Sequence, residues 1–331
     1  LPRAVFSSSY WIHWNIDDPA DADGTPDSEP TFRKALDRIE AGLNELRGVL
    51  PTLPRLRGFE NLPGIGTGLW ARQRFEPAGH LPLIQAAGFK AIELNIYKGR
   101  DHFDWDDRSA VNELRRVADD LGLLIWSIHS PDLGSIASPD GRERRQQIDV
   151  LKACIDQSGT LGARAIPSHA LLIAPFDQDP EGSEARISDA LDELTAAAEG
   201  CPAQLAFENA GFPSAASTRS VHILDRLETL SPAGFGFVLD TGHANIDGDL
   251  AEIDRHVGAH LISLHLNDNA GESDSHLVPG EGTVDWADVW GLIRRSGYRG
   301  VAMYEIELGD SEPEARLRST MEAHLRISAG S

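Results

Sequence analysis

Eight short apolar segments recur along this chain, and the interval between neighbouring segments is long enough for one helix. The segments are residues 65–71, 90–97, 123–129, 163–169, 204–209, 235–240, 260–267 and 300–307. Apolar residues at helical spacing fill the intervals, for example within 111–120 and 185–198. Repeated alternation of strand and helix predicts a parallel sheet, and eight such units suit a closed (β/α)8 TIM barrel of about 250 residues.

An open doubly wound α/β sheet is the alternative to a barrel. That fold usually carries a glycine-rich turn that opens a helix after the first strand. Gly64, Gly66 and Gly68 do not open a clear helix, so we interpret them as turn glycines. The closed barrel is therefore the predicted architecture.

Residues 1–62 differ from the rest and predict an N-terminal extension to a barrel of residues 63–331. Residues 17–30 are acidic and rich in small polar residues, as in an exposed loop. Residues 31–50 carry apolar side chains at helical spacing, which predicts an amphipathic helix. We expect this extension to pack on the barrel or to take part in a subunit contact.

The composition favours a cytoplasmic protein that does not bind nucleic acid. The formal net charge is −22, whereas nucleic-acid-binding proteins usually present basic patches. We expect no membrane helix, because no apolar run reaches the roughly 18 residues required, and no signal peptide. Cys154 and Cys201 form neither a metal-binding spacing nor a disulfide framework.

Ionisable residues stand at the ends of the apolar segments, as in FVLDTGHAN, where Asp240 ends a segment and His243 follows. In a barrel, the C-terminal ends of the strands converge on one mouth, where active sites form. The residues at these ends, with two from the segment ESDSHLVPGEG, are Glu93, His129, His169, Glu208, Asp240, His243, His265, Asp274, His276 and Glu305. Several converging carboxylates would repel one another without a cation, so this pattern predicts a metal site.

The expected ligands of this metal are Glu208, Asp240, His265 and Glu305, which follow the fifth to eighth strands. Glu307 shares a strand face with Glu305, but Glu305 is nearer the apolar run and is preferred. A mixed oxygen and nitrogen ligand set suits Mn, Co, Mg, Zn or Ni, and we favour Mn. Asp274 is a possible additional ligand.

These residues resemble the xylose isomerase-like TIM barrel superfamily, specifically its sugar phosphate isomerase/epimerase group, over roughly residues 63–331. The resemblance is carried by AFEN (206–209), LDTGHAN (239–245), HLND (265–268), VPGEGTVDW (278–286), GYRGVAMYE (297–305) and the long segment 129–163. It implies a carbohydrate substrate and a homo-oligomer, either a dimer or a tetramer.

The ketose 3-epimerases of this group imply roles for individual residues. Their four metal ligands match Glu208, Asp240, His265 and Glu305, and the two glutamates also move the proton through an enediolate. The histidine that matches His243 contacts the substrate. Two positions depart from that pattern, since His276 stands at or next to an expected arginine and Ser214 stands near an expected glutamate. The substrate is therefore expected to differ from a plain ketohexose.

The remaining residues of the predicted site are expected to bind substrate. His129, His169, His243 and His276 would bind hydroxyl groups, and Glu93 and Trp126 would line the mouth. Trp126 has a second interpretation as a core residue. If a leaving group departs after proton abstraction, the same site becomes a sugar dehydratase or a β-eliminating lyase, including one that deglycosylates keto-glycosides.

A second branch of the superfamily, the apurinic-site endonucleases, gives a different alternative. These phosphodiesterases bind three zinc ions through nine ligands. All nine have a match here: His129, His169, Glu208, Asp240, His243, His265, Asp274, His276 and Glu305. The acidic charge of the chain opposes DNA binding, as does Asp132 in the loop after His129, where a DNA-inserting loop would carry an apolar group.

Overall fold

Eight parallel strands form one sheet in the order β7-β6-β5-β4-β3-β2-β1-β8. They are β1 (Pro63–Gly66), β2 (Ala91–Asn95), β3 (Leu124–His129), β4 (Ala165–Ser168), β5 (Gln204–Glu208), β6 (Phe235–Asp240), β7 (Leu261–His265) and β8 (Ala302–Tyr304). This computed structural model describes residues 60–96, 102–169, 179–209, 220–230 and 234–329. The predicted loop and helix at residues 17–50, and Ser214, lie outside the described residues.

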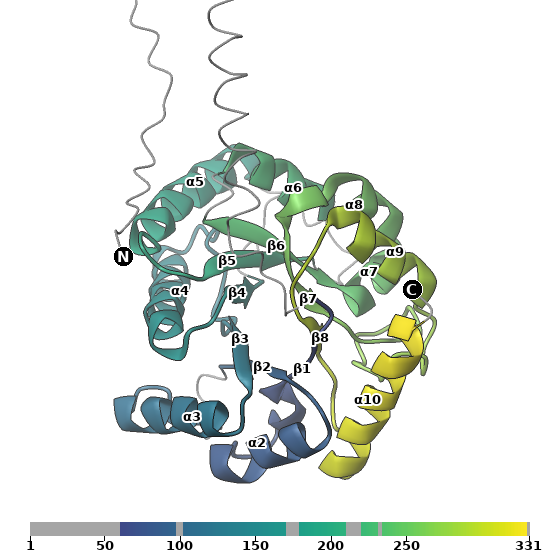
Figure 1. The fold of residues 1–331 in the computed structure, drawn as a ribbon. Helices are drawn as coiled ribbons and strands as arrows, with labels where there is room; N and C mark the ends of the chain where they lie inside the picture. Colours follow the sequence, from purple (N-terminus) through teal and green to yellow (C-terminus); the bar gives the residue numbers. More distant parts are fainter. Residues whose placement is uncertain (1–59, 97–101, 170–178, 210–219, 231–233, 330–331) are drawn as a thin grey trace, which may run out of the picture. The chain divides into compact units, whose positions relative to one another are not determined.

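The two end strands of the sheet meet and close it into a barrel (Figure 1). Leu266 donates its N–H to the Met303 carbonyl at 2.8 Å, and Glu305 donates to the Leu266 carbonyl at 3.2 Å. Leu266 and Tyr304 form the corresponding parallel bridge. The predicted TIM barrel is confirmed, and the open sheet is excluded because both of its edges are paired.

Helices surround the barrel, and short polar signals mark their ends (Figure 1). They are α2 (Pro77–Ala86), α3 (Arg108–Asp120), α4 (Gly141–Leu161), α5 (Pro180–Ala197), α6 (Ser220–Thr229), α7 (Thr241–Asp247), α8 (Leu250–His256), α9 (Trp286–Ser296) and α10 (Pro313–Ala329), with short 3-10 turns at Thr67–Trp70 and Gly258–His260. The carboxylates of Asp107, Asp140 and Asp285 accept hydrogen bonds from N–H groups in the first turns of α3, α4 and α9. None of the described helices is long and apolar enough to span a bilayer.

The first strand is shorter than expected, and this corrects the interpretation of its glycines. Gly64 and Gly66 lie within β1, not in a turn. A Cβ atom on Gly64 would lie 2.6 Å from Val301 Cγ1, so close packing requires glycine there. The strand ends because Asn95 accepts a hydrogen bond from the Gly68 N–H at 2.8 Å, and residues from Thr67 form a 3-10 turn.

The side chains alternate between two cores. Outward-facing residues such as Phe207, Phe237 and Leu239 pack beneath the helices. The Trp126 side chain crosses the interior, since its Nε1 lies 3.2 Å from Ser263 Oγ on β7, which does not pair with β3. It packs with Ala91 and other apolar residues in a separate cluster. Trp126 therefore lies in the core, which was the second interpretation of this residue. This placement does not support a role in lining the mouth.

A buried carboxylate holds the long loop after β7. Asp268 Oδ1 accepts hydrogen bonds from the N–H groups of Asn269 and Val284, and Oδ2 accepts from Gly280 N and Trp286 Nε1, at 2.7–3.0 Å. Asp268 is fully buried. These bonds join both ends of the loop, which contains Asp274 and His276, to the end of β7.

Replacing Asp268 by Ala is expected to lower the free energy of unfolding by on the order of 3 kcal/mol, because four N–H donors lose one buried carboxylate acceptor. Urea denaturation followed by circular dichroism measures this loss. Asp285→Ala is the matched control, since it removes a nearby carboxylate that only caps α9, and should cost about 1 kcal/mol. Equal losses in the two variants would contradict the role assigned to Asp268.

Candidate metal centre

Four residues from four strand ends meet at the mouth of the barrel. Glu208 ends β5, Asp240 ends β6, His265 ends β7 and Glu305 follows β8. Each offers a ligand atom, and all four atoms lie within 4.8 Å of one another. Glu208, Asp240 and His265 have no exposed surface, and the Glu305 side chain is 16% exposed. The structure thus brings together the four residues predicted as ligands, whereas the Glu307 side chain is 55% exposed and faces Arg72.

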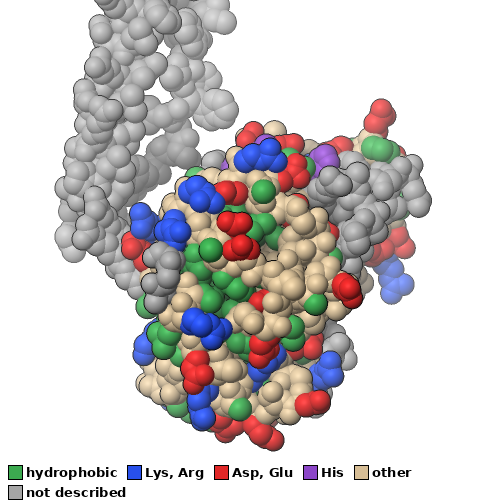
Figure 2. All heavy atoms as spheres, turned by 90° about the vertical axis from the view of Figure 1, so that its right-hand side faces the viewer, with side chains coloured by type: hydrophobic (Ala, Val, Ile, Leu, Met, Phe, Trp, Pro, Cys, Tyr) green, Lys and Arg blue, Asp and Glu red, His purple; other side chains and the backbone are tan. Residues whose placement is uncertain are grey.

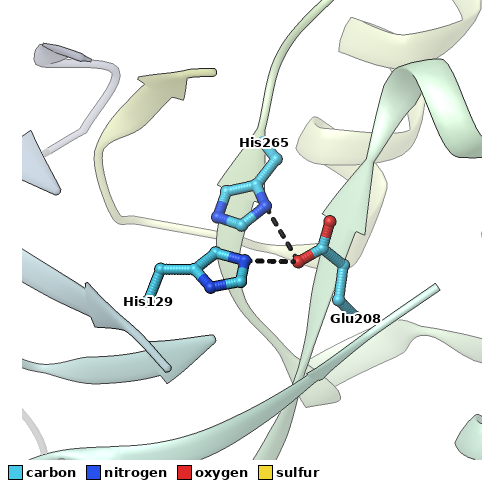
Figure 3. Close-up of side chains that lie close together, drawn as sticks. All are labelled: His129, Glu208 and His265. Carbon is cyan, nitrogen blue, oxygen red and sulfur yellow. Dashed lines mark ion pairs between the residues drawn. The ribbon is translucent and has the colours of Figure 1, made fainter. Parts of the chain in front are cut away.

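Glu208 is the centre of this arrangement, and histidines approach its carboxylate from several strands (Figure 3). Glu208 Oε2 lies 3.0 Å from His265 Nδ1, 3.2 Å from His169 Nε2 and 3.5 Å from His129 Nε2. Glu208 Oε1 lies 3.5 Å from His243 Nδ1. Burial opposes ionisation of Glu208, but His169 and His265 outweigh burial and hold its pKa well below the usual range.

Each of three histidines around Glu208 has one ring nitrogen bound to an outer acceptor. His129 Nδ1 lies 2.9 Å from the carbonyl of Ser130, and His169 Nδ1 lies 2.9 Å from Asp132 Oδ2. His265 Nε2 lies 3.1 Å from Glu93 Oε2. The other nitrogen of each ring faces Glu208. This arrangement is typical of metal-binding histidines, whose outer hydrogen bond fixes the ring and the tautomer.

Backbone and amide groups fix Asp240 in the same way. Its Oδ1 accepts from the His243 N–H at 2.7 Å, as the N-cap of α7, and its Oδ2 accepts from Asn267 Nδ2 at 2.7 Å. Asn209 pairs with the backbone of Asp240 in both directions. Burial raises the pKa of Asp240 to about 6. Its carboxylate would therefore gain from a nearby cation more than an exposed one would.

His243, Asp274 and His276 form an adjoining group of possible ligands. Asp274 Oδ2 lies 3.2 Å from His243 Nε2 and 2.9 Å from His276 Nε2. Burial opposes protonation of both rings, yet the nearby carboxylates, Asp240 for His243 and Asp274 for His276, raise the pKa of each to about 10. His276 has a backbone φ of 44°, an uncommon conformation for a residue other than glycine. Such strain is typical of functional sites.

The donor set fits a divalent cation. Within the described part of the chain, several inward atoms make no hydrogen bond: both carboxylate oxygens of Glu208, Nδ1 of His265 and Nε2 of His169. His169 Nε2 and His265 Nδ1 face Glu208 Oε2 at 3.0–3.2 Å, so a cation at the centre would have oxygen and nitrogen atoms directed toward it and would replace the missing hydrogen bonds. Carboxylate oxygen and imidazole nitrogen are ligands for Mn, Zn, Co and related ions.

Some residues of the site carried no role in the sequence-based prediction. Asn209 and Asn267 belong to the motifs AFEN and HLND, which indicated the family. The motifs did not indicate which groups the two amides contact. Asp132 was noted only as unsuited to DNA insertion, whereas its carboxylate contacts His169. Glu93, expected at the mouth, is fully buried and contacts His265 from the side opposite Glu208. Its position does not support direct contact with substrate.

Comparison with known proteins identifies the family. The model of the xylose isomerase-like TIM barrel family matches residues 81–327. The chain belongs to this family. It is 24% identical over 250 residues to D-psicose 3-epimerase of Enterocloster bolteae, covering 73% of this chain and 81% of that relative. It is 30% identical to the probable endonuclease 4 of Mycobacterium leprae, over 48% of this chain and 64% of that relative.

Solved structures show the same fold. The crystal structure of IolI protein with a bound zinc atom has a TM-score of 0.68 and 16% identity, and the match covers 81% of this chain and 98% of that one. The zinc belongs to that relative, while the candidate site here rests on its own four converging residues.

Metal affinity is expected to rise as the pH rises from about 6. In the metal-free protein the proposed ligand Asp240 has a pKa of about 6, raised by burial. Burial opposes protonation of the proposed ligand His265, but Glu208 and Glu93 raise the pKa of its ring well above the usual value. A cation must displace protons from any ring that it binds, so binding strengthens as pH rises. Chelator competition with Mn²⁺ at a series of pH values measures this trend, and a constant affinity would contradict it.

Proposed function

We propose that this chain is a divalent-metal-dependent isomerase or epimerase that acts on a sugar, a keto-sugar or a polyol. The family relationship to named epimerases supports an enzyme of this class. The observation that carries the proposal is the pair Glu208 and Glu305, two carboxylates from different strands that share one centre with Asp240 and His265. Two such groups can remove a proton from one substrate carbon and return a proton to that carbon or to its neighbour.

In this mechanism Glu208 takes a proton from the carbon next to a carbonyl, and Glu305 returns one to the resulting enediolate. The lowered pKa of Glu208 keeps its carboxylate ionised, as a base requires. A bound ion, held by Glu208, Asp240, His265 and Glu305, would polarise the substrate carbonyl as a Lewis acid. Return of the proton from the opposite face inverts the carbon, whereas transfer to the neighbouring carbon isomerises the sugar.

The other histidines would orient the substrate. His129, His169 and His243 each have a ring nitrogen near Glu208, and His276 has one near Asp274, which also contacts His243. Their fixed rings suit recognition of hydroxyl groups at defined positions. If the carbon next to the abstracted proton carries a leaving group, the same bases support elimination. A sugar dehydratase, or a lyase that deglycosylates keto-glycosides, is therefore compatible with this site.

A three-zinc phosphodiesterase is the second candidate, and a specific observation favours it. The groups His129–Glu208–His265, His169–Glu208–His243 and His243–Asp274–His276 adjoin the proposed centre, so all nine matched residues lie in overlapping ligand groups. The net charge of −22 opposes a DNA substrate. On the side of the barrel that Figure 2 shows, acidic and basic side chains of the described residues are intermixed.

The further properties proposed with this function rest on the resemblance and on composition. Manganese is the proposed metal, and a dimer or tetramer in the cytoplasm is the proposed state. Residues 1–62 are proposed as an extension that precedes the barrel, whose first strand begins at Pro63.

Glu208→Gln and Glu305→Gln are each expected to lower kcat for sugar epimerisation by at least about 100-fold, because an amide cannot accept or return the proton. Proton exchange at the substrate carbon, followed by NMR in D₂O, measures the chemistry directly. Glu307→Gln is the matched control, since its side chain is exposed and lies outside the proposed centre. Retained turnover in the Glu208 or Glu305 variant, with an intact fold, would remove the two-glutamate mechanism.

The number of bound ions separates the two candidate reactions. Elemental analysis of the purified protein should find about one ion per chain if the four-residue centre alone is occupied. Chelation should then abolish epimerisation, and Mn²⁺ should restore it. About three zinc ions per chain, together with cleavage of an abasic-site oligonucleotide, would favour the phosphodiesterase and overturn the first proposal.

A further inference from the structure

Glu93 lies inside the barrel, beside the metal site and away from solvent. It has no exposed surface, and it stands two residues before Asn95, the last residue of β2. Its Oε2 atom lies 3.1 Å from His265 Nε2 and accepts a hydrogen bond from Ser127 Oγ at 2.6 Å. We propose that Glu93 is the positioning residue of the metal centre, which turns the coordinating nitrogen of His265 toward the ion. This proposal rests on the metal site proposed above.

The contacts of His265 give each of its ring nitrogens a different task. Nε2 contacts Glu93, and Nδ1 faces both Glu208 at 3.0 Å and Glu305 at 3.1 Å. If Nε2 donates its proton to Glu93, Nδ1 presents a lone pair to the point where two proposed ligands meet. A half-turn of the ring would place carbon atoms at both positions. Glu93 therefore selects the tautomer and the ring orientation that suit metal binding.

The surroundings of Glu93 favour a role in positioning His265. Ala91 precedes it by two residues on β2 and packs with Trp126 and Met303 in the apolar interior cluster. Toward the mouth, His265 contacts the same carboxylate oxygen that accepts from Ser127. Glu93 therefore has apolar side chains on one side and the proposed metal ligand His265 on the other. A buried carboxylate is costly without a partner, and His265 supplies one.

An irregularity in the sheet builds the contact between Glu93 and Ser127. The pairing of β2 with β3 shifts register between Ile92 and Glu93, so that Ser127 becomes the partner of Glu93 and Trp126 is passed over. A regular register would place Trp126 opposite Glu93. The shift therefore brings a hydroxyl donor to the carboxylate, and β-bulges often re-aim side chains beside active sites.

The test compares Co²⁺ affinity and visible absorption in wild type, Glu93→Gln and Glu93→Leu. Leucine removes the acceptor, so Co²⁺ affinity should fall by about 10- to 100-fold and the absorption bands of the bound ion should change. Glutamine keeps an acceptor for the Nε2 proton and should restore most of the affinity and the wild-type bands. Glu113→Gln, an exposed carboxylate on α3, is the control and should leave both unchanged.

Two further comparisons keep the result interpretable. Ser127→Ala leaves the carboxylate in place and removes its hydroxyl donor, so affinity should fall less than in Glu93→Leu, and this variant serves if Glu93→Leu does not fold. The inference is overturned if Glu93→Leu or, in its place, Ser127→Ala binds Co²⁺ with wild-type affinity and bands. It is also overturned if Glu93→Gln matches the loss in Glu93→Leu, because rescue by an acceptor would then be absent.

This readout separates the inference from the proposed function. Metal affinity and the Co²⁺ spectrum do not depend on sugar turnover. A wild-type protein that binds Co²⁺ but epimerises no sugar, with weakened binding in Glu93→Leu, would refute the proposed reaction and support the role of Glu93. If the wild-type protein epimerises a sugar and Glu93→Leu binds Co²⁺ as the wild type does, the proposed reaction is supported and the role of Glu93 is refuted.

Discussion

The buried negative charge at the barrel mouth is the constraint on which the rest of the site depends. Glu93, Glu208 and Asp240 are fully buried within one barrel, and Glu305 lies beside them. Carboxylates in that environment repel one another unless cations or protons compensate. The histidines, the amides and the N-cap of α7 surround these carboxylates with donors, and the remaining inward oxygens of Glu208 make no hydrogen bond within the described residues. A divalent cation accounts for both the repulsion and the open oxygens.

The sequence was sufficient to predict the barrel because a parallel sheet imposes a strong pattern. Buried strands need continuous apolar runs, and each return to the same end of the sheet needs a helix. The exception was β1, where residues 65–71 read as one strand. There Asn95 on the neighbouring strand captures the Gly68 N–H, and a 3-10 turn begins. The hydrogen bond from Gly68 to Asn95 joins residues that are distant in the sequence, so a pattern of apolar residues cannot predict it.

The same distinction explains which parts of the site were predicted. A ligand at a strand end can be predicted from the sequence, because an apolar run followed by an ionisable residue is a local pattern. Asp240 in FVLDTGHAN is an example. The partner that orients a ligand is not local. Glu93 and His265 are 172 residues apart, and their contact requires closure of the barrel. The inward turn of Ser127 also depends on a register shift between two strands. Glu93 and Trp126 were therefore expected to line the mouth, whereas in the structure Glu93 contacts His265 and Trp126 packs with apolar residues.

Charge balance links the number of ions to the protonation of the outer histidines. Three carboxylates around a single divalent ion leave one negative charge in excess, Glu93 adds one beside His265, and Asp274 adds one beside His243 and His276. With one ion, protonated His243 and His276 offset two of these three charges, as their raised pKa values of about 10 allow. With three ions, the same rings must be neutral, because a lone pair on each would bind metal. The single-ion epimerase and the three-zinc phosphodiesterase thus differ in whether the outer histidines carry protons or metal, although the residues are the same.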